Sequence, residues 1–261
     1  TWMGGDRDGN PRVTAEVTRR TLELLSGAAR EKLLAAINEL RQELSVSDRR
    51  CEAPAALLAA IQRESAFKAA DADILAHAQY EPYRVRVLQI QSKLANDAGY
   101  TRAALLADLE ALRSWLHEVG LREEADEGPL GELILRVKVF GLHLASLDLR
   151  QHSAVHERVV AELLKLGGVH PDYASLDEDA RLTILRTELS GPRPLLRRGA
   201  QVSEESAELL GVLEVVAAAQ AREPDSVKAY VVSMTHSVSD LLEVLLLMKE
   251  TGLFRIEDDG V

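Results

Sequence analysis

Two segments of the chain change from apolar to polar at their C-terminal ends and lead directly into a helical pattern. Residues 142–151 are predicted to form a buried strand, and a helical periodicity follows over 153–166. Residues 227–234 are predicted to form a second strand, followed by a helix over 237–251. A strand followed by a helix, repeated along the chain, is the unit from which a parallel sheet is built. The sequence therefore predicts an α/β protein.

The first residues look like the end of a third unit of this kind. Trp2-Met3-Gly4-Gly5-Asp6 precedes a long helical pattern over 14–44, as though the front of its strand were missing. In parallel α/β folds, ligands gather at the C-terminal ends of the strands. We therefore expect three polar segments to converge on one site: residues 6–10, 148–151 and 234–236.

Most of the remaining chain has the three- and four-residue apolar spacing of amphipathic helices. Phe140-Gly141 divides an opening loop and helical region, residues 1–141, from the strand–helix units of 142–261. Both ends of the sequence resemble loops, so we expect 1–261 to be a single internal piece of a larger protein. Further helices are predicted over 55–67, 81–96, 101–119, 130–139, 179–189 and 203–222.

Composition restricts the class of function. The chain has 31 Lys and Arg against 42 Asp and Glu, a formal charge of −11. That balance argues against a nucleic-acid binder, which needs a basic face to displace counterions from phosphates. The single Cys51 excludes an intramolecular disulfide and a cysteine-built zinc site, and it suits a reducing compartment. No apolar run approaches the ~20 residues of a membrane span. We predict a soluble, cytoplasmic protein without a nucleic-acid or membrane partner.

The densest chemical signal is the loop Gly4-Gly5-Asp6-Arg7-Asp8-Gly9-Asn10-Pro11. Its glycines allow backbone N–H groups to approach a ligand, and Arg7 is a guanidinium predicted to be held by Asp6 and Asp8. The spacing fits neither a Walker loop nor a dinucleotide-binding loop. An EF-hand is excluded because Pro11 stands where the invariant glycine belongs. These residues alone favour equally a site for a small anion and a tight turn closed by an ion pair.

A second polar group ends the strand predicted over 142–151. Asp148 and Arg150 lie on one face of an extended segment, and Gln151 lies on the other. Taken alone, these residues favour an ion pair at the edge of the sheet slightly over a binding site.

Two other patterns are better explained by structural roles. Glu81-Pro82-Tyr83-Arg84 is typical of a helix start, because proline suits the first turn and glutamate favours the positive end of the helix dipole. His152 and His156 are spaced i, i+4, but no third ligand accompanies them, so no metal site is predicted.

Four segments, in this order along the whole chain, resemble the phosphoenolpyruvate carboxylase family. The opening ten-residue motif is the most specific match, and the other three support it. The matching segments are Trp2–Pro11 with Val13-Thr14, Glu81–Arg84, Leu147–Gln151, which is similar to a family Leu-Asp-Ile-Arg-Gln strand, and Ala229–Thr235 with Ser239-Asp240.

The resemblance implies a fold and a reaction. The family fold is a TIM-like (β/α) barrel embedded in many extra helices. This chain would supply about three parallel strands of that barrel and would be predominantly helical. The family enzymes are lyases that join bicarbonate to phosphoenolpyruvate, giving oxaloacetate and phosphate. Bicarbonate attacks phosphorus to form carboxyphosphate and the enolate of pyruvate, which then takes up CO₂.

The resemblance also implies roles for individual residues. Arg7 matches a family arginine that contacts the substrate phosphate, so it is the expected catalytic residue. His152 departs from the glutamate that the family usually has after Arg-Gln, whereas His156 matches a family histidine. The remaining expected substrate-binding residues are Asp6, Asp8, Asn10, Arg150 and Gln151.

The cofactor and partners also follow from the resemblance. The family uses Mg²⁺ or Mn²⁺, but its metal carboxylates, its catalytic histidine and a later Gly- and Arg-rich loop fall outside this sequence. We therefore expect no metal ligand in this chain and no carboxylase activity from the chain alone. The expected partners of the parent enzyme are phosphoenolpyruvate, bicarbonate and further copies of itself in a homo-oligomer, a tetramer by family resemblance.

Two other interpretations remain open. The chain could belong to a non-catalytic helical scaffold or regulatory protein that shares this region. It could also belong to another arginine-dependent phosphate enzyme on a barrel, which would need a pair of metal carboxylates inside the chain. Because an open sheet has unpaired edges, we expect the isolated chain to self-associate or to cover those edges with its own helices.

Overall fold

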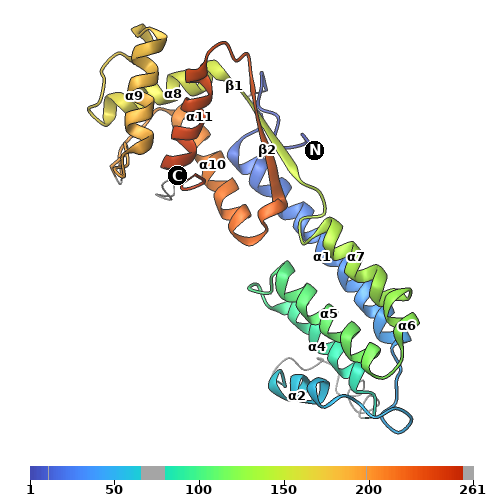
Figure 1. The fold of residues 1–261 in the computed structure, drawn as a ribbon. Helices are drawn as coiled ribbons and strands as arrows, with labels where there is room; N and C mark the ends of the chain where they lie inside the picture. The colour runs from blue at the N-terminus through green and yellow to red at the C-terminus, as the bar shows by residue number, and fades with distance from the viewer. Residues whose placement is uncertain (11, 66–79, 198, 255–261) are drawn as a thin grey trace. The chain divides into compact units, whose positions relative to one another are not determined.

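The computed structural model describes residues 1–10, 12–65, 80–197 and 199–254 (Figure 1). The chain forms two compact units. Unit 1 comprises residues 1–24 and 145–261, and unit 2 comprises residues 25–144. Helix α1 (Ala15–Glu43) contains the first boundary between them.

The sheet of unit 1 has two parallel strands among the described residues, β1 (Leu147–His152) and β2 (Val227–Ser233). The register pairs Asp148 with Ala229 and His152 with Ser233. Both strands were predicted, and each is followed by a helix as expected.

The predicted third strand is present only as a single parallel bridge between Asp6 and Arg150. The Arg7 N–H donates to the Arg150 carbonyl, and the Arg150 N–H donates to the Gly5 carbonyl, both at 2.9 Å. The expectation of three strands is therefore wrong for the described residues. The tight turn at Gly4 and Gly5, where Gly4 has φ +79°, leaves too short an extended stretch for a ladder.

The strand boundaries differ from the prediction at both strands. β1 begins at Leu147 rather than at residue 142, because the chain turns there and Leu144 has a φ of +61°. β2 ends at Ser233, because Met234 has a φ of +55° and cannot extend the strand.

In unit 1, α8 contacts β1 and α10 contacts β2, and the helices also pack on one another. Their starts are set by side chains that accept an orphan backbone N–H: His152 for α8, Asp177 for α9, and Ser203 for α10. A capping box of Ser237 and Asp240 begins α11. The elements are α8 (Ser153–Leu166), η1 (Tyr173–Ser175), α9 (Glu178–Ser190), α10 (Glu204–Arg222), η2 (Pro224–Ser226) and α11 (Val238–Glu250).

Within its described residues, the regular elements of unit 2 are all helices. Its core is built from leucines and isoleucines at helical spacing, with Leu105, Leu109, Leu112 and Leu116 of α5 all fully buried. Residues 120–128 contain the short helix α6. Residues 66 and 67, the end of the helix predicted over 55–67, lie outside the described residues. The elements are α2 (Ala55–Arg63), α4 (Pro82–Asn96), α5 (Arg102–Glu118), α6 (Arg122–Asp126) and α7 (Pro129–Phe140), together with the later part of α1.

The chain is thus predominantly helical with a small parallel sheet, as the sequence predicted. Across the ranges that the structure describes, no helix is both long enough and apolar enough to cross a membrane.

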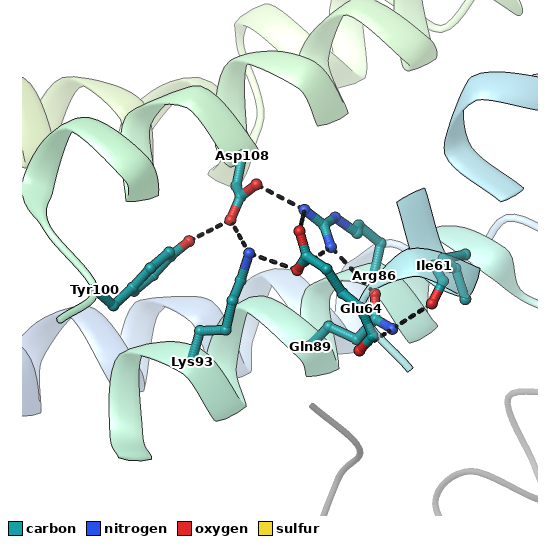
Figure 2. A network of polar contacts seen from close by, with 7 residues as sticks. All are labelled: Ile61, Glu64, Arg86, Gln89, Lys93, Tyr100 and Asp108. Atoms are coloured by element: carbon teal, nitrogen blue, oxygen red, sulfur yellow. Dashed lines mark hydrogen bonds and ion pairs between the residues drawn. The ribbon is translucent and has the colours of Figure 1, made fainter. Parts of the chain in front are cut away.

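Four charged side chains from three helices meet inside unit 2 (Figure 2). Arg86 of α4 is 3% exposed and bonds Glu64 and Asp108, each at 2.6 Å. Lys93, two turns further along α4, pairs with the same two carboxylates. Burial alone would lower the pKa of the Arg86 guanidinium, but its hydrogen bond to Glu64 and the charges of both acids raise the pKa. Two cations and two carboxylates therefore balance one another out of water.

Neutral groups complete this network. The Tyr100 hydroxyl donates to Asp108, and burial together with that carboxylate raises the pKa of Tyr100. Gln89 accepts from Arg86 at 3.2 Å and donates to the Ile61 carbonyl at 2.8 Å. The network joins α2, α4 and α5, and no pattern in the sequence predicted it.

Unit 1 also contains a buried carboxyl group, but the surroundings of this one favour its neutral form. Glu243 of α11 is fully buried, and its only hydrogen bond within the described residues is from the Tyr173 hydroxyl, at 3.0 Å. Burial, with a smaller contribution from nearby Asp240, raises the pKa of Glu243 to about 7, against the hydrogen bond from Tyr173. This carboxyl group is therefore protonated in the folded chain over a pH range where it ionises in the unfolded chain.

We expect the replacement Asp108→Asn to destabilise unit 2 by about 3 kcal/mol, because it leaves two buried cations with one carboxylate. The measurement is urea unfolding followed by circular dichroism. The control is Glu110→Gln on the same helix, whose ion pairs with Lys138 and Arg113 are at the surface and should cost below about 1 kcal/mol. Equal losses from the two variants would mean that the network adds no more than surface pairs do.

We expect the stability of unit 1 to fall as the pH rises from the ordinary glutamate value of 4.5 to about 7. In that window unfolding releases the Glu243 proton, so each step in pH favours the unfolded chain. Glu243→Gln removes this dependence. The unfolding free energy of the variant relative to that of wild type should therefore increase by about 3 kcal/mol between pH 4.5 and pH 8. Urea midpoints across that range measure it, with exposed Glu214→Gln as the control. A pH-independent difference between Glu243→Gln and wild type would contradict it.

Candidate functional site

A cavity of about 530 Å³ opens in unit 1 at the C-terminal end of β1. Its walls come from the opening motif, from the end of β1, from the first turns of α8 and from α10. Two of the three segments expected to converge here do so, since Arg7, Gly9 and Asn10 of the first and Gln151 of the second line the cavity. The third segment, 234–236, does not. It lies beside the start of α8, where the Ser153 hydroxyl donates to the Met234 carbonyl at 2.7 Å.

Arg7 is the central side chain of this cavity. Its side chain is 9% exposed, and Nη2 donates to Glu208 Oε1 at 2.9 Å. Its Nε and Nη1 atoms are buried and have no hydrogen-bond partner among the described residues. An unsatisfied buried donor costs about 1–3 kcal/mol, and more when it carries charge. Arg7 is therefore a cation whose hydrogen-bonding capacity is mostly unused.

Asp6 and Asp8 do not hold Arg7, so the expectation from the sequence is wrong on this point. Around the bridge to β1 the chain is extended, so neighbouring side chains leave on opposite faces. Asp6 and Asp8 lie on the face of Arg150, whereas Arg7 lies on the face of Gln151 and the cavity. The alternation predicted for Arg150 and Gln151 is confirmed.

Arg150 is the guanidinium that the two aspartates hold. Its Nη2 pairs with Asp8, Nη1 lies 3.7 Å from Asp6, and the guanidinium carbon is 5.1 Å from the centre of the Trp2 ring. The hydrogen bond from Arg150 is the main cause that lowers the pKa of Asp8. The predicted ion pair at the sheet edge therefore exists, but its carboxylates come from the opening loop and not from Asp148.

Glu208 is the residue that sequence reasoning missed. It lies on α10, 201 positions after Arg7, and its Oε1 accepts both from Arg7 and from the Ala15 N–H that opens α1. No motif surrounds it, and it is one of several acids on that helix. Only the packing of α10 beside the opening loop identifies it.

The glycines of the loop have a steric role. A Cβ atom on Gly5 would lie 2.2 Å from the Asp148 carbonyl oxygen, so the loop can approach β1 only with glycine at this position. This close approach is what allows the two backbone hydrogen bonds to β1.

The two remaining predicted residues, Asn10 and Gln151, serve local structure, as does the neighbouring His152. Asn10 accepts from the Arg12 N–H at 3.2 Å, and Gln151 accepts from the His152 N–H at 2.9 Å. The His152 ring Nδ1 accepts from the Ala154 N–H at 3.1 Å and so caps α8. All of Asn10, Gln151 and His152 also line the cavity.

The other histidine of the pair lies in the core. His156 is fully buried, and its Nε2 is 2.8 Å from the Tyr230 hydroxyl. Burial lowers the pKa of His156 to about 4, so the ring is neutral at physiological pH. Within the described ranges, no group of three His, Cys, Asp or Glu side chains is placed to hold a metal ion.

The Glu81–Arg84 segment is structural, as its residues favoured. Pro82 begins α4, and the buried Tyr83 hydroxyl donates to the Trp115 carbonyl at 3.0 Å. Glu81 accepts from the Ser45 hydroxyl at 2.6 Å and pairs with Arg84. All of these contacts lie within unit 2.

Comparison with known proteins supports the resemblance seen in the motifs. The family model for phosphoenolpyruvate carboxylase matches residues 1–260. The chain is 40% identical to a phosphoenolpyruvate carboxylase of Rhodothermus marinus, over 99% of this chain and 29% of the relative. It is 42% identical to that of Mycolicibacterium paratuberculosis, over 97% of this chain and 28% of the relative. The chain thus spans less than a third of the length of these curated relatives.

Proposed function

The chain belongs to the phosphoenolpyruvate carboxylase family, and we propose that it supplies, through Arg7, a contact to the substrate phosphate in an enzyme of that activity. The parent enzyme would carboxylate phosphoenolpyruvate with bicarbonate to give oxaloacetate and phosphate. The family relationship supports the reaction, and the cavity around Arg7 supports the residue.

The observation that carries this proposal is the incomplete pairing of Arg7. Its Nε and Nη1 donors are buried without partners beside a cavity of about 530 Å³. Phosphate oxygens accept hydrogen bonds from guanidinium groups in a matching planar geometry. Arg150, by contrast, is already paired with Asp8 and lies beside Trp2. Of these two arginines, Arg7 would gain more hydrogen bonds from a bound oxyanion.

In the proposed reaction, a bicarbonate oxygen attacks phosphorus, and the bond from phosphorus to the enolate oxygen breaks. Carboxyphosphate and the enolate of pyruvate result. Carboxyphosphate then releases CO₂ and phosphate, and the enolate carbon takes up the CO₂. Arg7 would remain on the phosphoryl oxygens throughout, where a fixed cation stabilises the charge that moves during the transfer.

The divalent metal of the reaction does not fit the residues described here, since they contain no group of three ligands for it. We therefore propose that the Mg²⁺ or Mn²⁺ ligands belong to other parts of the parent enzyme. Asp6, Asp8 and Arg150 would hold the opening loop, while Asn10 and Gln151 would line the substrate site.

Three wider expectations are proposals of the same kind. The parallel register of β1 and β2, extended by the bridge at Asp6, supports a partial TIM-like barrel. The parent enzyme would be a cytoplasmic homo-oligomer. The competing interpretation, a non-catalytic scaffold or regulatory protein sharing this region, predicts a parent that binds no phosphoenolpyruvate.

We expect Arg7→Ala in the full-length parent to lower kcat/KM for phosphoenolpyruvate by roughly 10²-fold, because a charge-assisted contact to the transferring group is lost. Arg7→Lys keeps the charge without the planar fork and should give an intermediate value. Steady-state kinetics and the melting temperature are measured together. Near-normal kcat/KM with a lowered melting temperature would mean that Arg7 only closes a structural turn.

We expect residues 1–261 alone to form no oxaloacetate from phosphoenolpyruvate, bicarbonate and Mg²⁺, because the transferring phosphoryl group needs a divalent cation to neutralise its charge. The assay couples oxaloacetate to NADH oxidation through malate dehydrogenase, with the parent enzyme as the positive control. Bicarbonate-dependent NADH oxidation above background would contradict this expectation.

A further inference from the structure

We propose that Glu208 is a positioning residue for Arg7: it fixes the guanidinium in the orientation that receives the substrate phosphate. This inference rests on the proposed function of Arg7, which it extends to a residue on a distant helix. Glu208 would not touch the substrate. Its effect on the reaction would pass through the single contact it makes with Arg7.

The first observation is that Glu208 is itself anchored. Its Oε1 accepts from the Ala15 N–H as well as from Arg7 Nη2. The Ala15 N–H is one of the donors that a helix start leaves without an intrahelical acceptor. This second bond is made to the backbone of α1, so it holds the carboxylate independently of Arg7.

The second observation is that helix α10, which carries Glu208, is packed into the core of unit 1. Leu209, the next residue, is buried, and Val212 one turn later is fully buried against β1. A functional side chain supported from a packed helix is held more closely than one supported only by its own loop.

The third observation is that Arg7 needs such a support. It follows two glycines, and its backbone is held by the Arg150 carbonyl, but that bond does not restrain the side chain. Because Nε and Nη1 have no partner among the residues that the structure describes, the bond to Glu208 is the polar contact that orients the guanidinium. Glu208 also occupies only one of its nitrogens and leaves the others for a ligand.

Two replacements of Glu208 distinguish the effect of its hydrogen bonds on the position of Arg7 from the effect of its charge. Glu208→Gln keeps a side-chain oxygen that can accept from both Arg7 and Ala15, so it should retain kcat/KM for phosphoenolpyruvate within about 3-fold. Glu208→Ala removes the acceptor and should lower that kcat/KM by about 10-fold. The KM for bicarbonate should stay unchanged in both variants. The matched control is Glu214→Ala, which removes an exposed carboxylate from the same helix.

The test is a double-mutant cycle in the full-length parent, with Glu208→Ala made in the wild-type and in the Arg7→Ala enzyme. If Glu208 acts through Arg7, its removal lowers kcat/KM about 10-fold in the first and less than 2-fold in the second. Equal losses in both would show that Glu208 acts independently of Arg7, and this would overturn the proposal. Normal kinetics with a lowered melting temperature would reduce Glu208 to a cap of α1.

The cycle also distinguishes this inference from the proposed function. If Arg7→Ala is severe but Glu208→Ala is neutral, Arg7 binds phosphate without help and only the role of Glu208 is wrong. If Arg7→Ala is itself neutral, both fail. Should Glu208→Ala not fold, Glu208→Asp replaces it, because it keeps the charge but withdraws the carboxylate by one methylene. Wild-type kcat/KM in Glu208→Asp would then overturn the proposal.

Discussion

Two backbone hydrogen bonds join the opening loop to strand β1, and the arrangement of the site depends on them. The Arg7 N–H donates to the Arg150 carbonyl, and the Arg150 N–H donates to the Gly5 carbonyl. They set the register of the loop, and the register decides which side chains leave on which face. One face gathers Asp6, Asp8 and Arg150 into an ion-paired group. The opposite face turns Arg7 toward the cavity.

Buried ionisable groups occur in three different environments in this protein. In unit 2, Arg86 and Lys93 share Glu64 and Asp108, so the cations and carboxylates balance. In unit 1, Glu243 has a pKa of about 7, and its burial favours the neutral form. Arg7 differs from both cases. Its guanidinium does not lose its proton, and a single carboxylate accepts from only one of its nitrogens. In our proposal, this incomplete pairing distinguishes Arg7, as a binding residue, from the charged residues with structural roles.

Membership of the phosphoenolpyruvate carboxylase family gives this geometry a chemical context. The family model covers residues 1–260, while the curated relatives are more than three times as long as the matched chain. A substrate site in such relatives can draw on residues from outside this chain. The cavity at the end of β1 is, in our proposal, one wall of that site.

The sequence by itself determined the local features of this protein. Apolar runs that turn polar predicted β1 and β2, helical spacing predicted most of the helices, and the density of the opening motif singled out Arg7. Such features depend on neighbours in the chain, so a pattern of a few residues contains them. The same patterns failed at the ends of β1 and β2, where Leu144 and Met234 adopt positive φ values that no local signal announces.

Only the tertiary structure decided which charges pair. Arg7 is 201 residues from Glu208, and Arg150 is 142 residues from Asp8, so no spacing in the sequence relates them. Glu64 and Asp108 likewise meet Arg86 from two other helices. Acidic side chains are frequent in this chain, and the sequence treats them alike. Which of them approaches a given arginine depends on how helices and strands pack, because an ion pair forms only where that packing brings both groups within a few ångströms and away from water.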